Sequence, residues 1–307
     1  MKSFKLLTPY SSLFTGVMDW IALASPAKIN LFLEVLFRRE DGYHEIRSIL
    51  HLIDLCDRLI LTRRREGIRV EVVGGAPSGW ENIAYRAAGL LFKKVGLRAG
   101  VKIHIEKRIP VGGGLGGGSS NAAATLWGLK RLYGLDLPLE DLMALGAQLG
   151  SDVPFFFFQG AALAEGRGER LRPLPPLLHL WVVVANPGFP VATAWAYQRL
   201  TLGLTPGGKV HKIVNLMEKG EGEKALSLSF NRFEEVVLAA HPEIASLKRR
   251  LVAMGARPAL MTGSGSSVFG FAQDRPHGEA MVEALRREGS FAVLCRTLDH
   301  NPMFDVK

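Results

Sequence analysis

Alternating apolar and polar positions predict the first regular element of the chain. Between residues 27 and 35 every odd-numbered position is apolar, and the even-numbered positions include Lys28 and Asn30. Successive side chains of a strand point to opposite faces, so the pattern predicts a strand from Ser25 with Lys28 and Asn30 on the same face. Phe32 falls on that face too and is expected to cover part of it.

The same reading predicts alternating strands and helices along the rest of the chain. Strands are expected within 57–75 (two, joined by a basic turn), 101–109, 153–166, 180–188, 258–272 (two, around a Gly-Ser turn) and 291–298; helices are expected within 81–96, 121–134, 142–150, 231–240, 242–254 and 279–289. The proline-rich stretch RPLPPLLH interrupts the pattern near Leu174. These features predict an α+β protein with an N-terminal extension (1–24), a first domain (25–174) and a second domain (175–307).

Composition narrows the class of protein. Of 307 residues, 48% are hydrophobic and 22% charged, and no apolar run approaches the roughly 20 residues of a membrane-spanning helix. Cys56 and Cys295 are the only cysteines. They have no metal-ligand spacing, and two lone cysteines in a chain this long argue for a reducing compartment, the cytoplasm, without a disulfide framework. The first residues lack a convincing secretory signal, and a start at Met18 would remove most of them.

The net charge of +9 favours anionic partners: nucleic acid, an anionic membrane face or phosphorylated small molecules. Charge alone does not choose among these three classes. The choice therefore depends on the candidate sites.

The stretch KRIPVGGGLGGGSSNAA, residues 107–123, is the strongest candidate site. It matches G-x-G-x-x-G at Gly112, Gly114 and Gly117, but such a dense run of glycine matches by chance, and no Gly-Lys-Ser/Thr of a Walker A loop follows. Glycines let backbone N–H groups turn toward an anion, and Ser119 and Ser120 are expected to cap a helix whose N-terminus favours phosphate. The stretch predicts a polyphosphate cradle, with a flexible surface loop as the alternative.

Several motifs together resemble one enzyme family. PVGGGLGGGSSNAA at Pro110, SPAKINLFL at Ser25 and TGSGSSVF at Thr262 resemble the three motifs of the GHMP kinases, the galactokinase, homoserine, mevalonate and phosphomevalonate kinases. DGYHE at Asp41 and GSDVPFF at Gly150 are similar to the branch whose substrate is a cytidine diphosphate-linked alcohol. The resemblance implies ATP-dependent phosphorylation of a hydroxyl, an N-terminal domain like the second domain of ribosomal protein S5, and a ferredoxin-like C-terminal domain.

The resemblance also implies catalytic and substrate-binding roles. Asp152 would accept the proton of the attacking hydroxyl, and Lys28 would stabilise the negative charge beside it. Asn30, on the face of Lys28, would hydrogen-bond the substrate. Tyr43 would stack on the cytosine and His44 would bond its edge, because a base offers a π-face and a polar rim.

The remaining roles concern a second aromatic contact and ATP. Tyr197 aligns with an aromatic contact to the base and Thr193 is its polar neighbour, with Trp195 as the alternative. The resemblance assigns the nucleoside to Asn82 and Lys107, and the phosphates to Pro110, Val111, Gly112, Gly113, Gly114, Leu115, Gly116, Gly117, Gly118, Ser119 and Ser120, with Gly263, Ser264 and Gly265 packed against them. ATP chemistry implies Mg²⁺, for which no protein ligand is nominated.

Three alternatives remain. Another GHMP kinase, acting on homoserine or a mevalonate derivative, would have no nucleobase for DGYHE to contact. An RNA-binding module would explain the charge and Arg63–Arg65 but leave the glycine run and Asp152 without a role. A dinucleotide oxidoreductase is third. The preferred interpretation expects a small-molecule substrate, no nucleic acid or membrane partner, and a monomer or homodimer.

Overall fold

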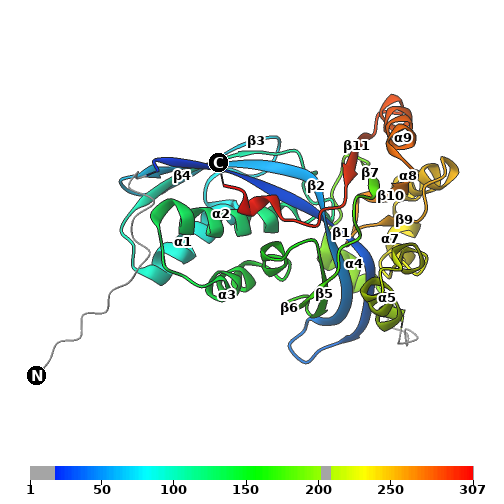
Figure 1. The fold of residues 1–307 in the computed structure, drawn as a ribbon, viewed down its shortest axis with the longest axis horizontal. Coiled ribbons are helices and arrows are strands. Elements are labelled where there is room, and N and C mark those ends of the chain that lie inside the picture. Colours follow the sequence, from blue (N-terminus) through cyan, green and yellow to red (C-terminus); the bar gives the residue numbers. More distant parts are fainter. Residues whose placement is uncertain (1–17, 202–208, 307) are drawn as a thin grey trace, which may run out of the picture.

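The computed structural model describes residues 18–201 and 209–306. The two longest strands, β1 (Trp20–Arg38) and β2 (His44–Arg64), form an antiparallel hairpin in the middle of the larger sheet (Figure 1). The turn between the strands contains Asp41 and Gly42, and Gly42 has a φ of 84°, a backbone conformation that favours glycine. The hairpin extends well beyond the body of the sheet and carries Tyr43 and His44 at its tip.

Among the described residues, seven strands form the larger sheet. Strand order is β3-β4-β2-β1-β8, and β5 pairs with β2 and with β6. The further members are β3 (Ile68–Val73), β4 (Gly100–Glu106), β5 (Ala161–Gly166), β6 (Arg170–Leu174) and β8 (Phe230–Asn231). Strands up to residue 174 all lie in this sheet, and β8 joins it from later in the chain, so the division at 174 stays a prediction.

Helices α1 (Ile83–Val95) and α2 (Gly117–Tyr133) pack against the larger sheet, and α3 (Leu139–Leu149) packs against α1 and α2 (Figure 1). The short 3-10 helices η1 (Gly79–Glu81) and η2 (Pro154–Phe157) flank them. Helix α2 lies close to the strands because Gly128 has no side chain: a Cβ there would lie 2.5 Å from a methyl group of Leu23. The helix that follows the glycine run is thus buried against β1 and β2.

The second sheet contains β7 (Trp181–Asn186), β9 (Ala259–Met261), β10 (Val268–Ala272) and β11 (Phe291–Arg296), in the order β11-β7-β10-β9. Its helices are α8 (Pro242–Ala253), between β7 and β9, and α9 (Arg275–Arg287), between β10 and β11. The β-α-β-β-α-β order with antiparallel neighbours is ferredoxin-like, as expected. The predicted α+β fold class is confirmed.

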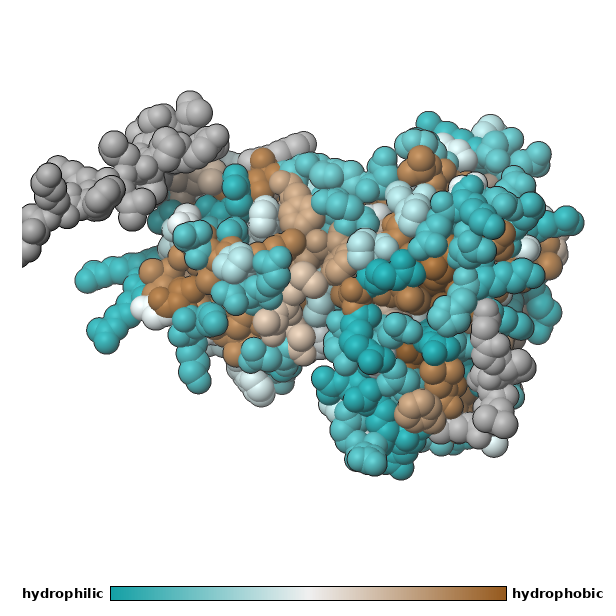
Figure 2. Space-filling view, turned by 60° about the horizontal axis from the view of Figure 1, so that its bottom comes forward, coloured by the Kyte–Doolittle hydropathy of each residue, from teal (hydrophilic) through white to brown (hydrophobic). Residues whose placement is uncertain are grey.

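Several shorter helices complete the fold. They are α4 (Thr193–Arg199), α5 (Lys209–Glu218), α6 (Gly222–Leu226), α7 (Glu234–Ala240) and η3 (Pro302–Phe304). Figure 2 shows an indentation between the part that carries α1–α3, at left, and the part at lower right, with hydrophilic residues over much of this face. The candidate site lies between the same two parts of the chain.

Four local predictions are wrong or shifted. Strand β1 begins at Trp20, so it includes residues assigned to the N-terminal extension. The run Phe155–Phe158 was expected in a strand, but its first three residues belong to the buried helix η2, which Pro154 begins. Residues 230–231 form β8 and α7 begins at Glu234, so no helix starts at residue 231.

The fourth concerns Phe32. The register of β1 against β2 shifts between Asn30 and Phe32, as at a β-bulge. Phe32 therefore leaves the face of Lys28 and packs on Phe230, with ring centroids 5.9 Å apart. Leu33 takes the place expected for Phe32 and lines the same pocket as Lys28 and Asn30.

Candidate functional site

Two pockets meet at the glycine run. The larger has a volume of about 860 Å³ and lies between the hairpin tip, α4 and the Gly-Ser turn after β9. The smaller, about 380 Å³, lies between η1 and residues 110–119. Gly114, Gly116 and Ser119 line both pockets, so the glycine run forms the partition between them.

The glycine run enters α2 through glycine rather than through a serine cap. Gly116 has a φ of 72° and precedes the helix, which begins at Gly117. The predicted cap at Ser119 and Ser120 is wrong, since both lie within the first turn. The first backbone N–H groups of a helix have no intrahelical acceptor, and here Gly117 and Gly118 line the smaller pocket. This pocket therefore presents N–H donors and the positive end of the α2 dipole to an anion.

The three sequence motifs come together around this run. The backbone N–H of Lys28 donates to the carbonyl of Leu115 at 3.0 Å, and the Thr262 hydroxyl donates to the carbonyl of Gly114 at 3.3 Å. A Cβ on Gly114 would lie 2.1 Å from the Thr262 carbonyl oxygen, so no other residue fits there. Strand β1 and the turn after β9 thus clamp the run from two sides.

Lys28, Asn30 and Asp152 form one part of the larger pocket, called its floor, and Lys28 is the cation there. Its side chain is 4% exposed, and its Nζ lies 3.8 Å from Oδ2 of Asp152 and 2.6 Å from Oδ1 of Asn30. Burial lowers the pKa of the Lys28 ammonium below its usual value of 10.5, and the charge of Asp152 opposes that shift. Sequence analysis placed Lys28 and Asn30 on one face, and their hydrogen bond confirms it.

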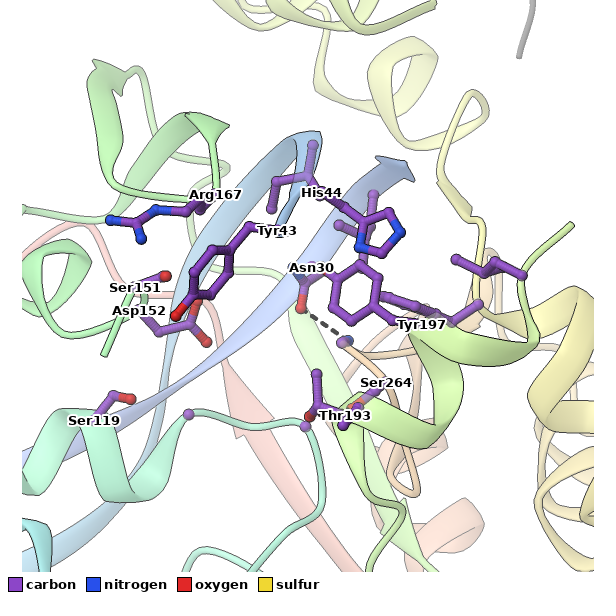
Figure 3. A pocket seen from close by; sticks show the side chains of 18 of the residues that line it. Asn30, Tyr43, His44, Ser119, Ser151, Asp152, Arg167, Thr193, Tyr197 and Ser264 are labelled. Carbon is purple, nitrogen blue, oxygen red and sulfur yellow. Dashed lines mark hydrogen bonds between the residues drawn. The ribbon is translucent and has the colours of Figure 1, made fainter. Parts of the chain in front are cut away.

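The side chain of Asn30 is bonded to residues of three elements. Its Oδ1 accepts from Lys28 and from the backbone N–H of Gly263 at 2.9 Å, and its Nδ2 donates to the Ser48 hydroxyl at 2.8 Å. Figure 3 shows Asn30 at the centre of the pocket. These bonds hold the amide oxygen of Asn30 against Lys28. Ser48 accepts from only one of the two N–H groups on Nδ2, so the contact between Asn30 and substrate stays a prediction.

Asp152 enters the pocket just after α3 ends at Leu149. Its side chain is 43% exposed, in contrast to that of Lys28. Ser151 and Ser119 line the pocket with it. An exposed carboxylate beside a buried ammonium is placed to accept a proton from a bound alcohol while the lysine offsets the charge that develops.

Aromatic rings from the hairpin tip and α4, together called the aromatic wall, line two sides of the larger pocket. The rings of His44 and Tyr197 stack with centroids 4.6 Å apart and an interplanar angle of 14°, while Tyr43 is 55% exposed. Figure 3 shows Tyr43 and Asp152 on one side of the pocket and the His44–Tyr197 pair on the other. The guanidinium of Arg167 lies 4.6 Å from the centre of the Tyr43 ring. These rings offer π-faces to a flat, polar-edged group.

Burial sets the protonation of the aromatic wall. It lowers the pKa of His44, with the charge of Arg38 acting in the same direction. It also raises the pKa of Tyr197 to about 12, with a further contribution from Asp152. At neutral pH His44 is therefore an uncharged imidazole and Tyr197 keeps its hydroxyl proton.

Four other predicted residues divide between the pocket and its surroundings. The Thr193 and Ser264 hydroxyls lie 2.9 Å apart, and both residues line the larger pocket. Trp195, the alternative to Tyr197, instead packs on His241 with ring centroids 5.2 Å apart. Gly265 packs near the sulfur of Met261 and supports the turn.

The predicted nucleoside residues line the smaller pocket, yet their side chains are engaged elsewhere. Asn82 caps α1 by accepting from the N–H of Ala84 at 2.9 Å, and it donates to the carbonyl of Pro77. Lys107 donates to the buried carboxylate of Asp57. The sequence pattern does not mark Asp57, because a single aspartate in a strand gives no motif. Its one signal is its place in β2 next to Arg58, which pairs with the last residue of β4, just before 107–109.

The described residues hold no evidence of two other kinds of site. Within 18–201 and 209–306, no three His, Cys, Asp or Glu side chains are grouped as metal ligands. None of the helices in these two ranges has the length and apolarity needed to cross a membrane.

Comparisons with known proteins agree with the geometry. The profile described as "GHMP kinases N terminal domain" matches residues 82–160, and "GHMP kinases C terminal" matches residues 214–290. A solved homoserine kinase from Cytophaga hutchinsonii aligns with a TM-score of 0.76 at 18% identity, over 96% of this chain and 99% of its own, which is a likeness of fold alone.

More similar relatives share one name. The chain is 45% identical to the 4-diphosphocytidyl-2-C-methyl-D-erythritol kinase of Geobacter sp. (strain M21), over 92% of this chain and 100% of the relative. It is 42% identical to the enzyme of that name from Shouchella clausii (strain KSM-K16), over 86% and 90%. A crystal structure of 4-(cytidine 5'-diphospho)-2C-methyl-D-erythritol kinase aligns with a TM-score of 0.78 at 39% identity, over 90% of this chain and 99% of its own. The chain therefore belongs to the GHMP kinases, within the family of 4-diphosphocytidyl-2-C-methyl-D-erythritol kinases.

Proposed function

We propose that this protein transfers the γ-phosphoryl group of ATP to the 2-hydroxyl of 4-diphosphocytidyl-2-C-methyl-D-erythritol, a step of the non-mevalonate isoprenoid precursor pathway. The observation that carries the proposal is the Lys28–Asp152 pair, with Nζ and Oδ2 3.8 Å apart, in the larger pocket, whose lining shares Gly114, Gly116 and Ser119 with the smaller one. One pocket presents helix N–H donors and the other presents aromatic rings. A hydroxyl beside Asp152 would thus face phosphates held by the glycine run.

The residues divide the work of phosphoryl transfer in a simple way. Asp152 accepts the hydroxyl proton as the oxygen attacks, and Lys28 neutralises charge on that oxygen and on the transferred group. The N–H groups at the start of α2 bind phosphate oxygens. Asn30 fixes the ammonium of Lys28 before the substrate arrives, so no reorganisation is needed during the reaction.

Selection of the cytidine falls to the aromatic wall. Tyr43 is exposed toward the pocket, and the His44–Tyr197 pair lies across from it, so a pyrimidine bound between them would have rings on two sides. The neutral imidazole of His44 has one donor and one acceptor for the edge of the base. Homoserine and mevalonate have no flat group for these rings, which argues against the alternative substrates.

Mg²⁺ is part of the proposal, chiefly as a partner of ATP. The donors fit an ion bound mainly by phosphates: the larger pocket contains the carboxylate of Asp152 and the hydroxyls of Ser119 and Ser151. Mg²⁺ keeps several waters and needs only one or two protein carboxylates beside substrate phosphates. When bound, the ion would neutralise charge on the phosphates.

We also propose a cytoplasmic enzyme that acts as a monomer or homodimer, with no nucleic-acid or membrane partner. The division into an ATP-binding domain (25–174) and a C-terminal domain (175–307) belongs to the same proposal. The RNA-binding alternative predicts tight, salt-sensitive RNA affinity.

The test measures ADP release by the purified protein with ATP, Mg²⁺ and 4-diphosphocytidyl-2-C-methyl-D-erythritol, beside homoserine and mevalonate. Turnover with the cytidylated substrate alone is expected. Turnover with another alcohol would overturn the reading of Tyr43, His44 and Tyr197. No turnover with any of them, in protein whose circular dichroism shows it folded, would overturn the proposed activity.

A further inference from the structure

The residues just before the glycine run are bonded to a buried carboxylate, that of Asp57 in β2. Asp57 is 1% exposed. Its Oδ1 accepts from the backbone N–H groups of Arg108 and Ile109, at 2.8 and 2.9 Å, and its Oδ2 accepts from the ammonium of Lys107. One side chain thereby fixes three consecutive residues, and the glycine run begins directly after them.

Lys107 extends this arrangement to the start of α2. Its side chain is 5% exposed, and a Cβ on Gly117 would lie 3.0 Å from its Nζ. The ammonium therefore lies against the first residue of the helix, next to the N–H groups that line the smaller pocket. A cation at a helix N-terminus is unfavourable without an anion, and Asp57 supplies one.

We propose that Asp57 is a positioning residue for ATP: through residues 107–109 and the Lys107 ammonium it holds the glycine run and the start of α2 in the geometry that binds phosphates. The inference rests on the proposed function. A buried ion pair adds little to stability compared with apolar residues of similar volume. Preorganisation of a binding loop, by contrast, directly reduces the ordering cost of binding.

Asp57→Asn separates positioning from charge. Asparagine keeps an oxygen for the two backbone N–H groups, but its amide nitrogen cannot accept from Lys107. Removal of a negative charge near the phosphates would by itself strengthen ATP binding. The positioning role predicts the opposite, a dissociation constant raised about tenfold, the size expected from one lost hydrogen bond to a charged group.

The probe is adenylyl imidodiphosphate with Mg²⁺, titrated calorimetrically without the alcohol substrate. The matched control is Glu106→Gln, which removes the same charge from the neighbouring strand, where Glu106 pairs with Arg58 on the surface at 3.0 Å. The control should bind the probe at least as tightly as the wild type. In turnover, the KM for ATP should rise in Asp57→Asn while the KM for the alcohol stays unchanged.

A second variant guards against misfolding. Asp57→Asn with Lys107→Met removes both charges, leaves the net charge unchanged and keeps the two backbone bonds; it too should bind the probe more weakly. If Asp57→Asn binds the probe as tightly as the wild type, the positioning role is wrong. If Asp57→Asn does not fold, the same result for the double variant decides the question. A wild type that fails to bind the probe would contradict the proposed function and this inference together.

Discussion

The floor and the wall of the larger pocket are held in different ways. On the floor, Lys28 and Asn30 are buried and hydrogen-bonded to each other, and Asn30 is also bonded to Ser48 and Gly263 from other elements. On the wall, Tyr43 is 55% exposed and its ring contacts Arg167, while His44 is held by its stack with Tyr197. The hydrogen bonds of the floor are thus in place before any ligand binds, whereas Tyr43 on the wall has an exposed ring.

This difference separates chemistry from recognition. A preorganised floor lowers the barrier to phosphoryl transfer whichever alcohol is bound, and its loss should lower kcat. Exposed rings gain their contacts only with the ligand, and their loss should raise KM. A substitution that lowers kcat therefore assigns its residue to chemistry, and one that raises KM assigns it to recognition.

The largest effect is expected for Asp152→Asn. The amide keeps the shape of the carboxylate but cannot accept the hydroxyl proton, so kcat should fall about 10²- to 10⁴-fold with little change in either KM. Steady-state kinetics measure it, and Asp141→Asn in α3 is a control with the same charge change away from the pocket. An Asp152→Asn variant with normal kcat would remove this residue from the mechanism.

Lys28→Met comes next. Loss of the ammonium removes the charge that stabilises the attacking oxygen, and kcat should fall about 10²-fold, the effect of losing one preorganised electrostatic contact. Lys28→Arg is the control, since it keeps the charge. A change in KM for the alcohol without a change in kcat would place Lys28 among the recognition residues.

The pH profile sharpens the role of Lys28. Its pKa is lowered by burial, so the ammonium loses its proton at a lower pH than an exposed lysine, whose pKa is 10.5. Activity should therefore decline as pH rises toward 10.5, before an exposed lysine would titrate. In Lys28→Arg that alkaline limb should move to higher pH, because arginine stays protonated; an unmoved limb would assign it to another group.

The residues of the floor could largely be predicted from the sequence. The contacts that hold the floor and the glycine run in place could not. Alternation placed Lys28 beside Asn30, and the motif around Asp152 marked the carboxylate. The bulge that turns Phe32 away leaves no mark in the pattern, because residues 31–33 are all apolar and fit either register. Asp57 acts on backbone groups some 50 residues later, a contact that only the folded chain brings about.

On the wall, Tyr43→Ala should raise the KM for the cytidylated substrate about tenfold and leave kcat within a factor of about two, because stacking on one base contributes about 1–3 kcal/mol. Tyr43→Phe should behave as the wild type if the ring face alone matters. A fall in kcat with unchanged KM would mean that the hairpin tip takes part in chemistry.

The smallest effect is expected for Thr193→Val, which replaces a hydroxyl by a methyl group of similar size. Its hydroxyl lies 2.9 Å from that of Ser264, on the border between floor and wall. One neutral hydrogen bond contributes about 1 kcal/mol, so the KM for the alcohol should rise about fivefold if Thr193 binds substrate. If instead it only steadies the Gly-Ser turn against the glycine run, the KM for ATP should change and that for the alcohol should not. Ser264→Ala removes the other member of the pair, and the two variants should then shift the same KM, which assigns the pair to one side of the division.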